Sequence, residues 1–196
     1  MMDDLLIVQD GQAASRSDAV RNRELLLETA RRLFAEKGVE AVPMSAVAEA
    51  AGVGKGTLYR HFPNKAQLCE SLIDEDQRQL QERTFAMLRT NPDPVVMLRW
   101  YVIEVSAFVF RNLDFLGSVD VGLAHPAHGW WHQTIRGLLG RVDFGPKADP
   151  PDLDYLTDML FLMLDGRAIF YQRNRRGWSL ERIQSGLLNA LDRVIG

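Results

Sequence analysis

Apolar residues recur at helical spacing along most of the chain, and glycine or proline separates the successive runs. The first clear run predicts a helix over Arg21–Lys37, where the apolar residues repeat every three or four positions and Gly38 ends the pattern. Residues 1–18 show no such period and are expected to form a flexible tail. Arg16, Arg21 and Arg23 gather near the start of that helix, and the alternative to a frayed tail is an arm that enters a DNA minor groove.

Residues 42–65 predict two short helices joined by a glycine turn. The apolar positions of the first helix stop at Gly52, which can take the left-handed conformation that ends a helix. The second helix begins at once, with Gly54 at its cap position. Two helices joined by so short a turn must cross steeply, which leaves the second exposed, as in a helix-turn-helix.

The second of these helices carries polar groups that suit a DNA duplex. Lys and Arg can bind phosphates or guanine edges, Thr can contact a phosphate or a thymine methyl group, and Tyr can donate to a phosphate. Glycines leave room for a close backbone approach. An ordinary helix corner with a solvated basic face remains the alternative. The residues predicted to bind DNA are Ser45, Gly54, Lys55, Gly56, Thr57, Tyr59, Arg60, His61 and Lys65.

The sequence of this stretch resembles that of a known family. The matching residues are Val47-Ala48, Ala51-Gly52-Val53, Gly56-Thr57-Leu58-Tyr59, His61-Phe62 and Asn64-Lys65. Together they resemble the signature of the TetR family of bacterial transcriptional regulators, over about the first third of the chain. Pro43 and Gly54 depart from it, because the family usually has a side chain there that caps a helix. The resemblance implies an all-α protein with a three-helix DNA-binding domain at 19–66 and a helical ligand-binding and dimerisation domain at 67–196.

The rest of the chain predicts further helices. A long helix begins after Asn64 and ends at the prolines near residue 92, and the run over Val95–Asn112 is apolar nearly all round and therefore buried. Residues 113–124 are less regular, and Pro126 opens another helix. Two final helices are predicted over Pro151–Asn174 and after Ser179. They carry more apolar surface than packing one side of each helix against the core of the protein requires. Such stripes suit a homodimer formed through the last two helices, and the resemblance implies the same.

Charge is distributed unevenly along the 196 residues. The net charge is −3, yet residues 16–68 carry nine Lys or Arg against six acids, so the basic balance lies where the motif lies. Cys69 is the single cysteine, which excludes an internal disulfide. The start of the sequence lacks a cationic signal-peptide region, and charges interrupt the apolar runs before they reach membrane-spanning length. We expect a cytoplasmic protein.

Aromatic residues and methionines of the second part exceed what a small helical core needs, so some are expected to wall an apolar effector cavity. The residues predicted to bind the effector are Met97, Trp100, Tyr101, Glu104, Phe108, Phe115, His128, Trp130, Trp131, His132 and Phe161. The resemblance implies a regulator that represses from a palindromic double-stranded DNA operator and leaves it when a small, mainly apolar ligand binds, and we expect no cofactor. No catalytic fingerprint supports an enzyme. The alternative is a helical metal-binding protein or enzyme that uses His125, His128 and His132.

Overall fold

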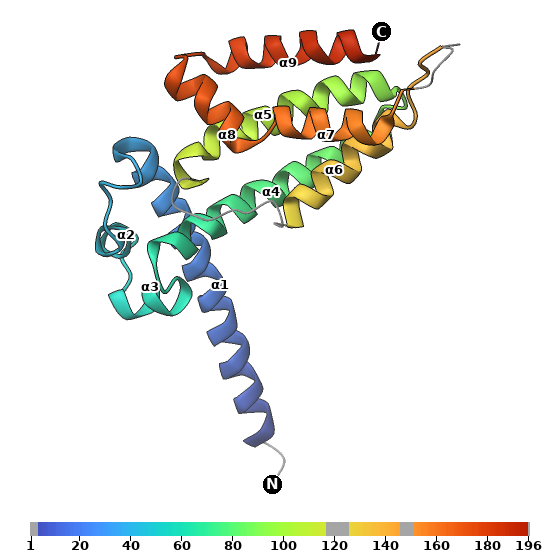
Figure 1. The fold of residues 1–196 in the computed structure, drawn as a ribbon. Helices are drawn as coiled ribbons and strands as arrows, with labels where there is room; N and C mark the ends of the chain where they lie inside the picture. Colours follow the sequence, from blue (N-terminus) through green and yellow to red (C-terminus); the bar gives the residue numbers. More distant parts are fainter. Residues whose placement is uncertain (1–3, 117–125, 146–150, 196) are drawn as a thin grey trace. The chain divides into compact units, whose positions relative to one another are not determined.

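The computed structural model describes residues 4–116, 126–145 and 151–195, and the regular elements in those ranges are all helices (Figure 1). The chain divides into two compact units, Met1–Leu72 and Ile73–Gly196. Helix α4 contributes to both, because the division falls inside it. The elements are α1 (Asp4–Lys37), α2 (Met44–Ala50), α3 (Lys55–His61), α4 (Lys65–Thr90), α5 (Pro94–Leu116), α6 (Pro126–Leu139), α7 (Leu153–Met163), α8 (Gly166–Phe170), η1 (Tyr171–Arg175) and α9 (Leu180–Ile195).

The first unit is built on α1, which contacts α2, while α2 contacts α3. Helix α1 ends at Lys37 as predicted, and Gly38 follows with φ +79°. Its beginning differs from the expectation, since helix occupies most of residues 1–18, where the sequence predicts an aperiodic tail. The physical reason lies in propensity, because this segment contains leucines and alanines and no proline. Amphipathic periodicity alone does not reveal such a helix.

The turn between α2 and α3 has the predicted geometry. Gly52 has φ +67°, and the Val53 amide donates to the Ala48 carbonyl over 3.0 Å. This hydrogen bond, five residues back along the chain, closes a Schellman motif at the end of α2. A side chain with a Cβ atom would be strained at Gly52, so the glycine sets where α2 stops and where α3 can begin.

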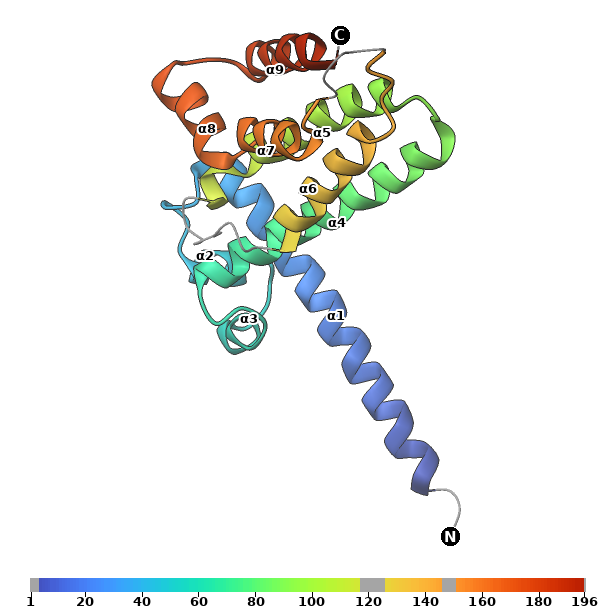
Figure 2. The same ribbon diagram turned by 45° about the vertical axis from the view of Figure 1, so that its right-hand side comes forward.

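Helix α5 is the centre of the second unit and contacts α6, α8 and α9 (Figure 2). Tyr101 and Val105 are fully buried on it, as expected for a run that is apolar nearly all round. The predicted helix over Val95–Asn112 is therefore confirmed, with an end that extends to Leu116. The predicted helix from Pro126 is confirmed as α6. Residues 117–125 lie outside the described ranges, and so does most of the predicted irregular segment 113–124.

The single helix predicted over Pro151–Asn174 is broken in the structure. Helix α7 ends at Met163, and Asp165 then caps a new helix, accepting from the Arg167 amide over 2.8 Å. An aspartate carboxylate competes for backbone amides in this way, so Asp165 starts α8 where the hydrophobic pattern alone suggests continuity. One π-helical turn, η1, follows α8.

The last helix, α9, turns its regular apolar stripe inward. Ser179 caps it as predicted, accepting from the Arg182 amide over 3.3 Å. Ile183, Leu187 and Leu191 are at most 4% exposed, and α9 contacts α5 and α7. These three side chains therefore belong to the core of the protomer, so the prediction that the stripe of the last helix faces a second subunit is wrong. The large exposed apolar side chains of residues 151–195 are Tyr155, Met159, Leu162, Phe170 and Tyr171. No described helix has both the length and the apolar composition needed to cross a bilayer.

Candidate nucleic-acid interface

Helix α3 has one packed side and one open side. Leu58 is fully buried and Phe62, directly after the helix, is 1% exposed. Gly54 is the capping residue before the helix, and its carbonyl accepts from the Thr57 amide over 2.9 Å. Neither Gly54 nor Pro43 provides a side-chain cap, as the sequence predicts. The apolar side thus holds α3 in the unit, while its polar side chains remain available.

Five of the predicted DNA-binding residues are polar side chains of α3. Lys55, Tyr59 and Arg60 are exposed, whereas Thr57 and His61 are half-buried. The Arg60 guanidinium donates to the Thr57 hydroxyl over 3.1 Å. This bond uses one nitrogen of the guanidinium, and the other N–H groups can still donate to a partner outside the protein. The structure therefore places cationic and hydroxyl donors on one short helix.

Gly54 and Gly56 are not required by packing within the protein. A Cβ atom built at either position meets no atom within 4 Å apart from its chain neighbours and the backbone of its own helix, and neither residue has a positive φ. Alanine would also favour the helical state at Gly56. The protein fold alone therefore gives no reason for glycine at position 56, whereas a closely approaching partner would.

Lys65 makes contacts that sequence reasoning did not predict. Its ammonium group donates to the carbonyls of Val39 and Glu40, over 2.8 and 3.3 Å. Lys65 thereby ties the start of α4 to the segment between α1 and α2, and the ammonium group has a third donor. The predicted cap of α4 is present, since Asn64 accepts from the Gln67 amide over 2.9 Å. The remaining predicted residue, Ser45, is half-buried in the first turn of α2.

Cys69 lies one turn after Lys65 and is fully buried. Burial raises the pKa of its thiol to about 11, and the nearby Lys65 ammonium opposes that shift only in part. The thiol therefore stays protonated and packs as a small apolar group rather than reacting as a nucleophile.

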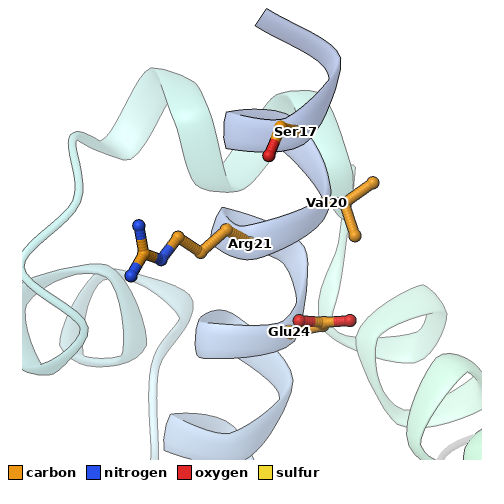
Figure 3. Close-up of a pocket in the computed structure, with 4 residues that line it drawn as sticks. All are labelled: Ser17, Val20, Arg21 and Glu24. Atoms are coloured by element: carbon orange, nitrogen blue, oxygen red, sulfur yellow. The ribbon is translucent and has the colours of Figure 1, made fainter. Parts of the chain in front are cut away.

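Helix α1 also carries basic groups in this unit. The Arg23 guanidinium lies 5.5 Å from the centre of the Phe62 ring, a cation–π contact that supports the end of α3. A hollow of about 460 Å³ is lined by Ser17, Val20, Arg21 and Glu24, which all come from α1 (Figure 3). Arg21 points to one side of the helix, away from Val20 and Glu24. Side chains of a single helix cannot enclose a ligand, so this hollow is not a candidate effector pocket.

In the second unit the predicted effector residues form two sets of ring contacts. Trp131 lies edge-on to Phe108 at 5.5 Å, and His128 lies between Trp131 and Phe161, at 5.6 and 5.5 Å. His132 joins the same set through Phe161 at 6.0 Å. A second set connects Tyr101, Trp130 and the additional residue Phe85, with centroid distances of 5.9 and 6.2 Å.

The other predicted effector residues lie elsewhere on α5. Met97 is fully buried and Phe115 nearly so, while Trp100 is half-buried. Glu104 accepts from Arg83 of α4 over 2.9 Å. A second hollow, of about 220 Å³, contains none of the predicted effector residues. It is lined by Leu139, Gly140, Val142, Phe144, Gly145, Pro151 and Leu153.

Sequence reasoning missed three buried polar residues of this unit, Asp76 and Gln77 on α4 and Asn112 on α5. Each is at most 9% exposed. Asn112 donates to Asp76 over 3.0 Å, and Gln77 accepts from the Trp131 indole over 3.0 Å. A signal was present in the sequence, because Asp76 and Gln77 occupy the apolar stripe of α4 between Ile73 and Leu80.

The three histidines of the metal alternative do not form a ligand set in the part of the chain that is described. His125 lies outside those residues. His132 pairs with Asp158 over 2.7 Å, and His128 contacts aromatic rings. The described residues contain no group of three His, Cys, Asp or Glu side chains arranged to hold a metal ion.

Comparisons with known proteins agree with this geometry. Residues 26–72 match the model of the bacterial regulatory proteins of the tetR family. An HTH-type transcriptional regulator of Staphylococcus aureus (strain bovine RF122 / ET3-1) is 48% identical over 183 residues, covering 91% of this chain and 97% of that protein.

Two solved structures share the fold at low sequence identity. A transcriptional regulator from Saccharomonospora viridis in complex with choline has a TM-score of 0.66 at 22% identity, over 88% of this chain and 96% of that one. The regulator FadR from Bacillus subtilis in complex with stearoyl-CoA has a TM-score of 0.61 at 20% identity, over 86% and 96%. With its helix-turn-helix, its helical second unit and a close relative along nearly its whole length, the chain belongs to the TetR family of transcriptional regulators.

Proposed function

We propose that this TetR-family regulator is a homodimeric repressor that binds a palindromic operator and leaves it when a small, mainly apolar effector binds. Residues 19–66 would recognise DNA, and residues 67–196 would bind the effector and the second subunit. The observation that carries the proposal is α3, whose polar side is exposed and whose Gly56 has open space beside it.

The DNA contacts divide by chemistry. We assign Lys55, Thr57 and Arg60 to the major groove, where their donors can read base edges. Tyr59, His61 and Lys65 would hold phosphates, with Ser45 near the backbone at the start of α2. Gly54 and Gly56 would let the α3 backbone approach the duplex closely. For Lys65 this role uses the donor that is left after Val39 and Glu40.

A dimer through α7, α8 and η1 is supported by exposed apolar area and by charge. Tyr155, Met159 and Leu162 recur at helical spacing on α7 and are 40 to 64% exposed. Acids gather at the start of this segment, with Asp152 and Asp154, and arginines at its end. An antiparallel pairing about a two-fold axis would therefore place opposite charges together and cover the apolar side chains.

An effector role is supported by the ring contacts among Phe108, His128, Trp131 and Phe161, which include aromatic edges and an imidazole ring. Proteins of the same fold hold choline and stearoyl-CoA. Helix α4 is the candidate lever, because it is continuous from Lys65 to Thr90 and contributes to both units. A near-complete switch requires the effector to prefer the DNA-incompetent state by about 5.5 kcal/mol.

The test begins with selection of binding sites from random-sequence DNA by the purified protein. We expect inverted repeats whose half-sites lie about one helical turn apart. The logarithm of the binding constant should fall linearly with the logarithm of salt concentration, with a slope of about −0.9 per neutralised phosphate. The double variant Lys55→Ala and Arg60→Ala should lose sequence preference, whereas Arg89→Ala, a matched exposed arginine at the end of α4, should not. Enrichment of no sequence, or equal loss in both variants, would contradict the proposal.

A further inference from the structure

Side chains from α4, α5 and α6 form a closed ring of contacts inside the second unit. Asn112 donates to Asp76 over 3.0 Å and to the Phe108 carbonyl over 2.9 Å. Phe108 lies edge-on to Trp131, whose indole donates to Gln77 over 3.0 Å. Gln77 follows Asp76 along α4 and so completes the ring. We call these five residues, Asp76, Gln77, Phe108, Asn112 and Trp131, the polar ring.

The chemistry of the partners fixes how both amides of the polar ring are oriented. The Asn112 amide nitrogen faces a carboxylate oxygen and a backbone carbonyl, which both only accept, so nitrogen must stand there. The Gln77 amide oxygen faces an indole N–H, which only donates, so oxygen must stand there. Flipping either amide would set like groups against each other.

Each amide consequently presents one unused atom. The Asn112 side-chain oxygen and the Gln77 side-chain nitrogen are both buried and have no hydrogen-bond partner among the described residues. Asn112 is fully buried and Gln77 is 7% exposed. An amide buried without its hydrogen bonds is unfavourable, so a pair of this kind within one ring requires an explanation. One of the atoms accepts and the other donates.

We propose that the polar ring recognises the polar end of the effector, and that this end is an uncharged group carrying both a donor and an acceptor, such as a primary carboxamide. The ligand N–H would donate to the Asn112 oxygen, and the ligand carbonyl would accept from the Gln77 nitrogen. Phe108 and Trp131 would contact the apolar remainder of the molecule. This inference rests on the proposed effector role of residues 67–196 and assigns its polar specificity.

Three small aromatic probes of similar size separate the two interactions. Benzamide has the donor and the acceptor, acetophenone replaces the amino group by methyl and keeps the acceptor, and toluene has neither. Dissociation constants would be measured with the full chain by ligand-detected NMR titration. We expect benzamide to bind about tenfold more tightly than acetophenone, and acetophenone about tenfold more tightly than toluene, as buried hydrogen bonds of ordinary strength require.

Two substitutions should each remove one step of that order. Gln77→Met should abolish the preference for acetophenone over toluene and keep that for benzamide over acetophenone. Asn112→Leu should do the reverse. Thr84→Val is the matched control, because Thr84 is also buried on α4 but bonds within its own helix, to Leu80 over 2.8 Å, and both preferences should persist. If Asn112→Leu does not fold, the probe affinities of Gln77→Met and the order of affinities in the wild type still test the inference.

Several outcomes would overturn the inference. They are equal binding of the three probes, no binding by any of them, persistence of both preferences in the variants, and tighter binding of benzylammonium than of benzamide, which would indicate an electrostatic site. Operator release is measured separately by fluorescence anisotropy with the same probes. The expected order without operator release would leave the polar ring as a site and remove its sensor role. Release by other compounds without that order would keep the sensor and refute the polar ring.

Discussion

The two compact units differ in how far they keep apolar side chains inside and polar side chains outside. In the first unit, apolar Leu58 and Phe62 are buried under α3, and polar Lys55 and Arg60 are exposed above them. The second unit keeps polar side chains of the polar ring inside and leaves large apolar side chains outside, on α7, α8 and η1. The first arrangement is the usual one for a surface helix. The second unit departs from it in its buried polar side chains and in its exposed apolar side chains.

The difference indicates where to look for binding in each unit. A surface that follows the simple amphipathic pattern binds through the chemistry of its exposed groups, here cations and hydroxyls suited to DNA. A unit that breaks the pattern has buried amides to satisfy and apolar area to cover, and each of these calls for a partner of a different kind. The predictions below test this contrast, beginning with the largest expected effect.

The largest effect is expected from a charge on the exposed apolar surface of the second unit. Leu162 is 57% exposed, so Leu162→Glu should leave the protomer folded and prevent dimerisation. Specific operator affinity should fall about 1000-fold, toward the level of non-specific binding. Leu187→Glu is the comparison, because Leu187 is 4% exposed and its substitution should instead unfold the unit. Sedimentation and circular dichroism distinguish these results, with Leu162→Met as control. A wild-type protein that sediments as a monomer at micromolar concentration would refute the dimer.

A smaller effect, with opposite signs on stability and binding, is expected at Gly56. Gly56→Ala should raise the free energy of unfolding by up to about 1 kcal/mol, because alanine favours helix and the new methyl group meets open space. DNA affinity should nevertheless fall at least about tenfold, since that space is assigned to the duplex.

Gly137→Ala provides the matched control for this prediction. Gly137 is an exposed glycine of α6 that also has open space beside it. Its substitution should raise the free energy of unfolding without changing DNA affinity. Thermal unfolding and anisotropy titrations measure both quantities. Unchanged DNA affinity in Gly56→Ala would show that α3 does not approach the duplex closely.

Two lysines of the first unit should separate structural from DNA-binding contributions. Lys65→Ala should lower the free energy of unfolding by about 1 kcal/mol, through the lost bonds to Val39 and Glu40, and should also reduce the salt slope by about one. Lys55→Ala should reduce the salt slope without destabilising the unit, because this exposed side chain has no side-chain bond among the described contacts. An altered base preference at one position for Lys65→Ala, with an unchanged slope, would contradict its phosphate role.

The smallest effect concerns Cys69. Its raised pKa, about 11 against an ordinary value of 9.0, means that the unfolded chain ionises first as the pH rises. The stabilising contribution of the protonated thiol is therefore complete below about pH 9 and is lost between about pH 9 and 11. The free energy of unfolding should fall more steeply across that window in the wild type than in Cys69→Ala. Equal slopes would show that the thiol is not protected by burial.

The first unit could be predicted closely from the sequence because its signals are local. Gly38 and Gly52 mark helix ends through backbone conformation, and Asn64 caps the next helix, so each boundary depends on residues next to it. The tie from Lys65 to Val39 could not be predicted in this way, because it joins segments that are distant in sequence.

The second unit could be predicted only at the level of helices. The break at Asp165 was missed because the hydrophobic period continues across it while a single carboxylate caps a new helix. Leu187 and Leu191 belong to a regular apolar stripe, but its spacing does not reveal whether it packs against the core of its own protomer or against a second subunit. The polar ring depends on contacts between three helices, and only the interrupted stripe of α4 hinted at it.

The central claim, that α3 of each subunit lies in a major groove of the same operator, can be tested by tethered cleavage. Cys69 is the single cysteine, so Cys69→Ala combined with Lys55→Cys gives one reactive thiol on α3 for an iron chelate. We predict two symmetric clusters of DNA cleavage within the selected operator, separated by about one helical turn, roughly 34 to 36 Å. The same chelate at Arg89→Cys, at the end of α4, should not produce these clusters. The claim would be contradicted if both labels cleaved DNA evenly along the operator, or if only the label on α4 produced cleavage clusters.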